Sequence, residues 1–417
     1  MPALQSVVLS AFACSGAAQN AGALPPAVQS MVAETLRLFI RAPHEDEDAD
    51  AVSAAMVGAA EVCKTIGGAM VHGLQIPTTD NKDGAGGPSV PLPQMLSEII
   101  LHVLREDAIC QCFAEDSDDE DEEPEEDAEN DLAAEKARVG EVLMEGLAQL
   151  LPAMCELSAE GFIATFTEGF PLLMRQGERR HSDHQRSLVS AILVDCVKAL
   201  GNLATPCIPV VMPYLLKEMQ AADPVNRRNA AFCAGSCFAA AGAYATAAQF
   251  IPQLQPALNH LMANPEEDPA VVDNAAGALA RIVTAMLAAS PTPQLPFADC
   301  LNALLIALPI KLPLADCLNA LLLALPIKED DDETEPIYLA VCQLLSTKDS
   351  SVVPLVPRAL QAFGGATQDP NMKPVIMRHI ADLLRMLAQG HEAELQAVMA
   401  SLPAEQQAAL TALMNSH

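Results

Sequence analysis

Two pairs of closely spaced cysteines are the first residues in this 417-residue chain whose types could do chemistry. Cys110 and Cys112 lie in "CQC", and Cys233 and Cys237 lie one helical turn apart. Either pair could give two thiolates to a metal ion, but a structural zinc site takes four protein ligands. Neither pair has a second pair at zinc-like spacing, so we expect no metal site.

Two further segments contain side chains that are common in active sites. "DGAGGP", from Asp83 to Pro88, lacks the Lys-Ser/Thr of a phosphate-binding loop, so a flexible loop explains it better. "RRHSDH", from Arg179 to His184, holds two histidines, and a polar turn between helices explains it better than a metal site. No Gly-x-Ser-x-Gly element and no catalytic pair of carboxylates is recognisable. We therefore predict no catalytic residue, no cofactor and no enzyme activity.

The strongest chemical signal is acidic. From Glu115 to Asp131 the chain reads "EDSDDEDEEPEEDAEND", which is 13 acids in 17 residues within a net charge of −31. Such a field repels nucleic acid and attracts basic proteins in a salt-dependent way. The candidate contacts to a basic partner are Glu115, Asp116, Asp118, Asp119, Glu120, Asp121, Glu122, Glu123, Glu125, Glu126 and Asp127. For the shorter runs at Glu45 to Asp50 and Glu329 to Glu335, solubility is the better explanation.

The elements that must position these residues are expected to be helices. Hydrophobic residues make up 51% of the chain, yet it has only 11 Phe, 3 Tyr and no Trp, so Ala, Leu, Val, Ile and Met must build the core. This mixture favours helices, the 31 prolines indicate short ones, and no convincing strand or hairpin signal is present. We predict an all-α chain, with a loop from Thr78 to Pro93.

Cellular context follows from the cysteines and the N-terminus. The 12 cysteines show no disulfide-framework spacing and are typical of reduced core residues in an intracellular protein. The apolar N-terminus has no basic residue before Arg37, so it lacks the first part of a signal peptide. The uncharged stretch from Asn229 to Pro265 is interrupted by Gly, Asn and Pro, which argues against a membrane span. We expect no membrane contact.

A repeat of about 42 to 45 residues organises the chain. "DPVNRRNAAFCAG" begins at Asp223 and "DPAVVDNAAGALAR" begins at Asp268, 45 residues later, and in each we expect Asp-Pro to start a helix. A third Asp-Pro, at Asp369, fits the same repeat period if one copy of a 17-residue duplication is left out of the count. This period predicts HEAT or armadillo repeats, stacked as a right-handed superhelix of antiparallel helix pairs. We expect one continuous α-solenoid, with repeats over residues 1–113 and 134–417 and an acidic loop over residues 114–133.

Polar residues that recur within the repeat are expected to join neighbouring repeats. Asn229 and Asn274 occupy the same repeat position, where a buried asparagine bonding the neighbouring backbone is favoured over a cargo contact. Asp273 and Arg281 are candidates for ion pairs between stacked helices. The predicted repeat-stacking residues are Arg228, Asn229, Asp273, Asn274 and Arg281.

Several segments together resemble a known family. "RRNAAFCAG" from Arg227, "DNAAGALARIV" from Asp273, "ALPIKEDDDETEPIY" from Ala324 and "MASLPAEQQAALTALM" from Met399 resemble the C-terminal part of karyopherin-β (importin-β type) nuclear import receptors. The resemblance runs from about Leu36 onward. It implies a protein that shuttles between cytoplasm and nucleus, carries basic cargo such as histones or ribosomal proteins, and contacts the FG repeats of nucleoporins.

The family's receptors are more than twice as long as this chain, and their N-terminal repeats supply the main Ran-GTP surface. We therefore expect a fragment, without that surface and with only part of the nucleoporin contacts. The repeat pattern alone also permits a second hypothesis, a HEAT-repeat scaffold for complex assembly that takes no part in transport.

The duplication itself, residues 295–328, repeats "LPFADCLNALLIALPIK" as "LPLADCLNALLLALPIK". Each 17-residue copy encodes one helix between prolines, whereas the array adds helices in pairs. We expect the second copy to take the regular place in the array, and the first copy, Leu295 to Lys311, to be an extra helix displaced from it.

Overall fold

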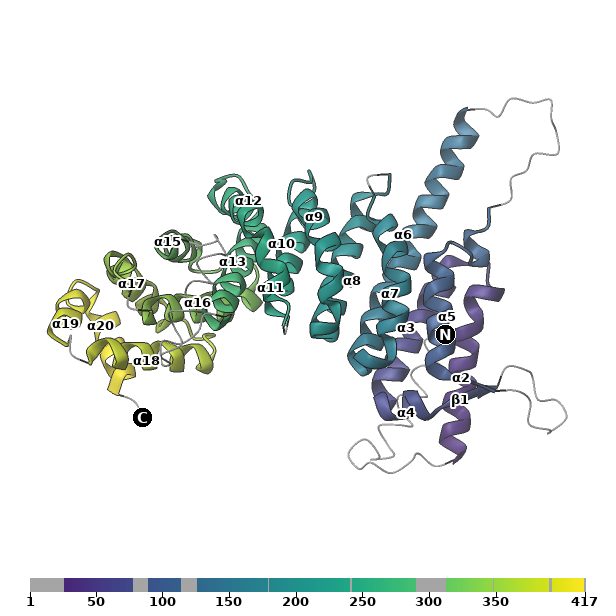
Figure 1. Cartoon of the computed structure of the whole chain (residues 1–417), viewed down its shortest axis with the longest axis horizontal. Helices are drawn as coiled ribbons and strands as arrows, with labels where there is room; N and C mark the ends of the chain where they lie inside the picture. The colour runs from purple at the N-terminus through teal and green to yellow at the C-terminus, as the bar shows by residue number, and fades with distance from the viewer. Residues whose placement is uncertain are drawn as a thin grey trace, which may run out of the picture. The chain divides into compact units, whose positions relative to one another are not determined.

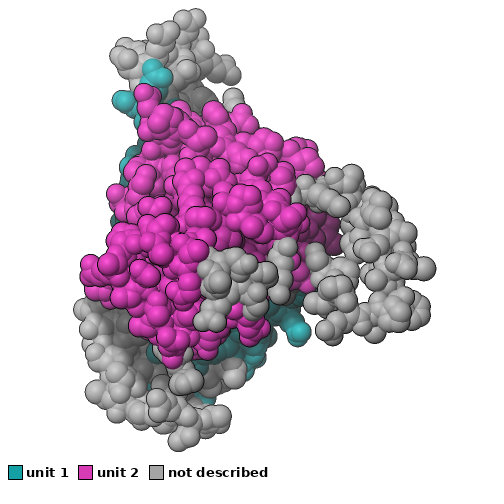
Figure 2. All heavy atoms as spheres, turned by 90° about the vertical axis from the view of Figure 1, so that its left-hand side faces the viewer, with its two compact units in different colours: residues 1–203 teal, residues 204–417 magenta. Residues whose placement is uncertain are grey.

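The computed structural model describes residues 26–77, 89–113, 126–178, 180–240, 242–289, 313–347, 349–389 and 392–415. They are almost entirely helical, and helix pairs stack in succession, which confirms the all-α solenoid class. The chain divides into two compact units, residues 1–203 and 204–417, coloured teal and magenta in Figure 2.

Unit 1 arranges its helices in two rows. In one row α3, α6 and α8 pack side by side, and in the other α2, α5 and α7 do so (Figure 1). Met56, Leu143, Phe162, Phe166 and Ile192 are fully buried between the rows. The elements are α2 (Pro26–Glu45), α3 (Ala49–Ile66), α4 (Gly68–Gly73), α5 (Leu92–Leu104), the 3-10 helix η2 (Ile109–Gln111), α6 (Glu126–Leu157), α7 (Ala159–Gln176) and α8 (Asp183–Leu200).

Unit 2 repeats this plan. In one row α10, α13, α16, α18 and α20 follow one another, and in the other α9, α12, α15, α17 and α19 do so (Figure 1). The elements are η3 (Gly201–Cys207), which begins before the unit boundary, α9 (Ile208–Glu218), α10 (Pro224–Ala239), α11 (Tyr244–Ala247), η4 (Ala248–Phe250), α12 (Ile251–Ala263), α13 (Pro269–Ala289), α15 (Leu314–Ala324), η5 (Asp331–Glu333), α16 (Thr334–Ser346), η6 (Val353–Leu355), α17 (Val356–Ala366), α18 (Pro374–Ala388), α19 (Glu392–Met399) and α20 (Ala404–Asn415).

Local sequence explains where many helices begin. Asp48, Ser158 and Ser182 accept hydrogen bonds from the first-turn amides of α3, α7 and α8, which no carbonyl within the helix can satisfy. Both predicted Asp-Pro starts are confirmed, since α10 and α13 begin at Pro224 and Pro269. The third Asp-Pro, which was used only for the repeat period, behaves differently.

At the third Asp-Pro, the Asp369 carboxylate accepts the amide of Asn371 in a turn, and α18 begins only at Pro374. Asp side chains favour such local turns as readily as helix caps. The helices α10, α13, α16 and α18 begin at residues 224, 269, 334 and 374, so the repeat spacing is less uniform than predicted.

Two other predictions need correction. A short antiparallel pair, β1 (Gln75–Pro77) and β2 (Ser89–Pro91), was not foreseen, because each strand has only three residues and ends in proline. The predicted acidic loop over 114–133 is too long, because α6 already begins at Glu126. Acids at a helix N-terminus are favourable to the helix dipole, so an acidic sequence there need not be a loop.

The second copy of the duplication forms α15, which packs against α12, α13, α16 and α17 with Cys317, Leu318 and Leu321 buried. This is the regular place that we predicted for it. The first copy, residues 295–311, lies outside the described residues, so its displacement stays a prediction.

Two stretches, Asp183–Glu218 and Pro269–Ala289, are long and apolar enough to cross a membrane by length and composition. The first is not one helix, because the backbone turns at Gly201, where φ is +55°. The second is α13, whose Val271, Leu279 and Ile282 are buried among α10, α12 and α16. We interpret both as core segments of the helical array.

Candidate functional site

Most of the predicted cargo-binding acids lie outside the described residues. This holds for Glu115, Asp116, Asp118, Asp119, Glu120, Asp121, Glu122, Glu123 and Glu125, whereas Glu126 and Asp127 open α6. Figure 1 shows the N-terminal part of α6 projecting beyond the rest of unit 1, and residues 130–138 are all exposed there. The acidic run is therefore followed in the sequence by a helix whose first turns project from the unit 1 core.

Some charge on this projecting helix is neutralised locally. The guanidinium of Arg138 contacts the carboxylates of Glu135 at 2.9 Å and of Asp50 at 3.4 Å. The hydrogen bond from Arg138 holds the pKa of Glu135 below its usual value. All three side chains are about half exposed or more, so these pairs leave the helix solvated and strongly acidic.

In unit 2, the acidic run from Glu329 to Glu335 divides into two kinds of side chain. Glu329, Asp331 and Asp332 are exposed. Glu333 is fully buried, and its two carboxylate oxygens accept hydrogen bonds of 2.8 and 3.0 Å from the Arg281 guanidinium of α13. This bidentate pair spans two repeats and fixes η5, the 3-10 helix that carries the exposed acids.

Asp273 holds the beginning of the same run. One oxygen of its buried carboxylate accepts the backbone amides of Lys328, Glu329 and Asp330 at 3.1, 2.7 and 3.2 Å. Next to it, the Asn274 amide donates to the Asp330 carboxylate at 2.9 Å and to the carbonyl of Ala270 in its own helix at 2.8 Å. The predicted bond from Asn274 to a neighbouring backbone is therefore replaced by one to a neighbouring side chain.

A glycine allows this close approach. A Cβ atom on Gly277 would lie 1.5 Å from the Oε2 atom of Glu333, so the carboxylate occupies the space of the missing side chain. The Arg281 guanidinium also lies 4.8 Å from the ring centre of Phe232 in α10. Helices α10 and α13 and the 3-10 helix η5, which leads directly into α16, are thereby linked around one arginine.

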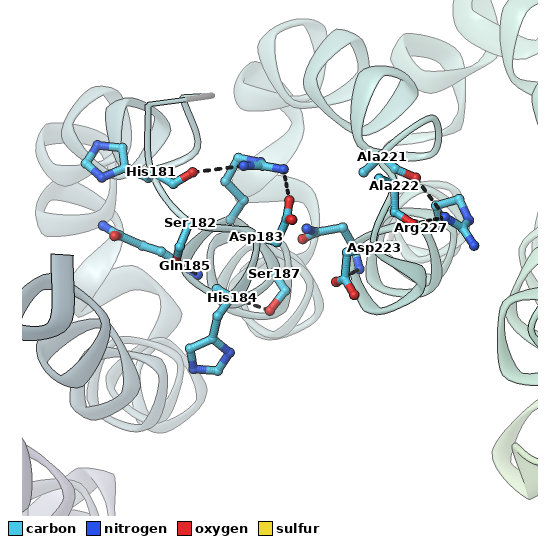
Figure 3. Close-up of polar contacts among 12 residues, drawn as sticks. His181, Ser182, Asp183, His184, Gln185, Ser187, Ala221, Ala222, Asp223 and Arg227 are labelled. Atoms are coloured by element: carbon cyan, nitrogen blue, oxygen red, sulfur yellow. Dashed lines mark hydrogen bonds and ion pairs between the residues drawn. The ribbon is translucent and has the colours of Figure 1, made fainter. Parts of the chain in front are cut away.

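The other two predicted stacking residues lie next to each other in α10. Arg228 and Asn229 are half-buried, and the Nε atom of Arg228 lies 3.5 Å from the Oδ1 atom of Asn229, its own neighbour. Sequence reasoning missed Arg227 instead. Its guanidinium pairs with Glu267 at 2.5 Å. It also donates to the carbonyls of Ala221 and Ala222 at 2.7 and 2.6 Å, as Figure 3 shows.

A groove of about 680 Å³ adjoins the anchored acids of unit 2. Phe238, Tyr244, Ala285 and Leu339 give it an apolar lining from α10, α11, α13 and α16. Asp332 is the exposed acid at its edge. Its other lining residues include Arg281, Thr284, Ala288 and Glu335.

The candidate metal residues of the sequence are dispersed. His181 and His184 point apart in Figure 3, and the Nε2 atom of His184 lies 3.1 Å from a Glu145 oxygen. Eight of the ten described cysteines are buried, as expected for core residues. Within the described ranges no three His, Cys, Asp or Glu side chains are grouped as metal ligands would be.

No protein-family model matches the chain. Over 280 residues, 67% of the chain, it is 28% identical to human Importin-4 and 26% identical to mouse Importin-4. The match spans 24% of the length of each of those proteins. A chain of the solved Kap95:Nup1 complex has the same fold with a TM-score of 0.51 at 15% identity, over 99% of this chain and 47% of that one. The resemblance to importin-type karyopherins is therefore confirmed, and so is the solenoid fold.

Proposed function

We propose that this Importin-4 homologue is part of a nuclear transport receptor that binds basic proteins, such as histones or ribosomal proteins, through its acidic surfaces and shuttles with them between cytoplasm and nucleus. The observation that carries the proposal is the dense carboxylate run that leads into the projecting end of α6. A second acidic surface, Glu329, Asp331 and Asp332, is rigidly anchored in unit 2.

Physical chemistry supports basic cargo over other partners. A net charge of −31 repels nucleic acid and accelerates the approach of a positively charged protein. A dense run of carboxylates binds Lys- and Arg-rich tails with an affinity that falls as salt screens the charges. Nucleoporin FG repeats are partners that the similarity to importins brings into the proposal, whereas Ran-GTP is a partner of the full-length receptors.

Binding of a labelled histone H3 tail peptide, measured by fluorescence anisotropy between about 50 and 300 mM salt, tests the first step. The variant replaces the carboxylates over residues 115–125 with their amides, which leaves α6 intact from Glu126. A control variant keeps the same acids in scrambled order. We expect the amide variant to lose affinity at least tenfold at low salt and to show a flatter salt dependence, and the scrambled variant to match the original. Equal binding by all three would remove the acidic run from the proposed function.

A further inference from the structure

The groove in unit 2 combines an apolar lining with acidic side chains. Phe238 and Tyr244 meet edge to face there, with ring centres 6.3 Å apart, beside the small side chains of Ala285 and Ala288. Its volume of about 680 Å³ is within the range of roughly 300–1,000 Å³ of sites that enclose ligands. Small residues opposite aromatic rings leave space for a large apolar side chain of a partner.

The charge at the groove is negative. Arg281, the basic residue in its lining, is paired with buried Glu333. Asp332 is exposed, and Glu335 contacts Lys373 only at 3.7 Å. A partner that places a lysine or arginine beside Asp332 gains an opposite charge at the edge of an apolar site, where water screens it less than on an open surface.

The acidic side of the groove is also preorganised. Asp332 lies in η5, whose backbone follows directly from the three amides held by Asp273 and whose last residue, Glu333, is clamped by Arg281. A carboxylate on an anchored element loses less conformational entropy on binding than one on a free loop.

We propose that this groove binds an extended segment of a partner protein in which one large apolar side chain stands next to a lysine or arginine. The apolar side chain enters between Phe238 and Ala285, and the cation pairs with Asp332. This proposal rests on the proposed function, because it assigns a second element of recognition to basic partners. The groove would select partners by an apolar residue, which electrostatic attraction alone does not distinguish.

The test uses two labelled 12-residue peptides that differ at one position, one with a Lys-Leu-Lys core and one with a Lys-Gly-Lys core, both flanked by Gly and Ser. Binding to the full chain is measured by anisotropy at about 150 mM salt. We expect the leucine peptide to bind at least tenfold more tightly, since burying a leucine side chain is worth about a tenfold or larger change in affinity.

Two matched pairs of variants locate the site. Ala288→Trp fills the groove at an exposed lining position, and Ala408→Trp adds the same ring at an exposed position of α20 outside it. We expect Ala288→Trp to abolish the difference in affinity between the peptides and Ala408→Trp to keep it.

A second pair tests the charge. Asp332→Asn and Asp331→Asn remove one charge each from the same 3-10 helix, and only Asp332→Asn should weaken the binding of both peptides, about threefold. Circular dichroism confirms that each variant is folded.

The outcomes separate this inference from the proposed function. Equal binding of both peptides, unaffected by Ala288→Trp, would overturn the groove and leave the acidic surface as the only recognition element. Failure of both peptides to bind would overturn the groove proposal, whereas the proposed function would fall only if the histone H3 tail peptide also failed to bind. Tighter binding after removal of residues 295–311 would assign the groove to the chain's own duplicated segment and would likewise overturn the proposal.

Discussion

Replacing Gly277 by alanine tests the anchoring of the acidic run most sharply. The new Cβ atom would lie 1.5 Å from Oε2 and 2.3 Å from Cδ of Glu333, so the carboxylate must leave its position. Glu333 is fully buried and Arg281 is 14% exposed, so the displaced pair cannot simply be solvated. Breaking such a buried pair costs about 3–5 kcal/mol. Alanine is favoured over glycine in a helix by about 1 kcal/mol, so we expect a net loss of about 2–4 kcal/mol.

The assay is urea unfolding followed by circular dichroism, together with hydrogen exchange of the amides of residues 328–330. A repeat array can unfold in parts, and the exchange rates report the local loss directly. Gly365→Ala is the control, because a Cβ atom there meets nothing within 4 Å, and it should be neutral or stabilise by up to about 1 kcal/mol. In a Glu333→Ala background, Gly277→Ala should no longer destabilise. A neutral Gly277→Ala in the original chain would refute the reasoning.

Three further predictions follow from the structure. Asp273→Ala should destabilise by about 3 kcal/mol, because three backbone amides lose the buried carboxylate that accepts them, and Asp273→Asn by clearly less, as urea unfolding would show. Burial and the adjacent His44 lower the pKa of His102 in the folded protein. As the pH falls below about 6.5, the unfolded state therefore protonates this histidine before the folded state does, and the free energy of unfolding should decrease until the pH passes the folded pKa. His102→Gln should reduce that decrease, as melting curves at several pH values would show. Iodoacetamide at pH 8 should label exposed Cys112 at once. Burial raises the pKa of the Cys63, Cys317 and Cys342 thiols to about 12, so mass spectrometry should find these three protected from alkylation. Rapid labelling of those three would contradict their burial.

The helical rows could be predicted because their determinants are local. An Asp-Pro pair and a periodic run of small apolar residues are enough to start α10 at Pro224 and α13 at Pro269. The same pair at Asp369 makes a turn, because Pro374 offers a competing helix start five residues later. Local signals therefore indicate that a helix is present more reliably than where it begins.

The partners of the polar residues could not be read in the same way. Asp273 and Arg281 stand out in the sequence as unusual charges on an apolar helix, yet their partners lie 52 to 57 residues away, at or just after the end of the duplicated stretch. Nothing local distinguishes Glu333, which is buried and paired, from Asp332, which is exposed. Arg227 pairs with Glu267, 40 residues away, and nothing in the sequence marks it above its neighbour Arg228. Non-local packing decides all three cases.

Import in digitonin-permeabilised cells tests the central claim most directly, and it separates a transport receptor from a scaffold. A fluorescent fusion carrying a histone tail is added with this chain, with and without Ran and an energy source. The account predicts that the chain raises nuclear fluorescence above the level of the fusion alone, and that amidation of the acids over residues 115–125 abolishes the increase. Tight binding of the same fusion without any nuclear accumulation would contradict transport and favour the scaffold.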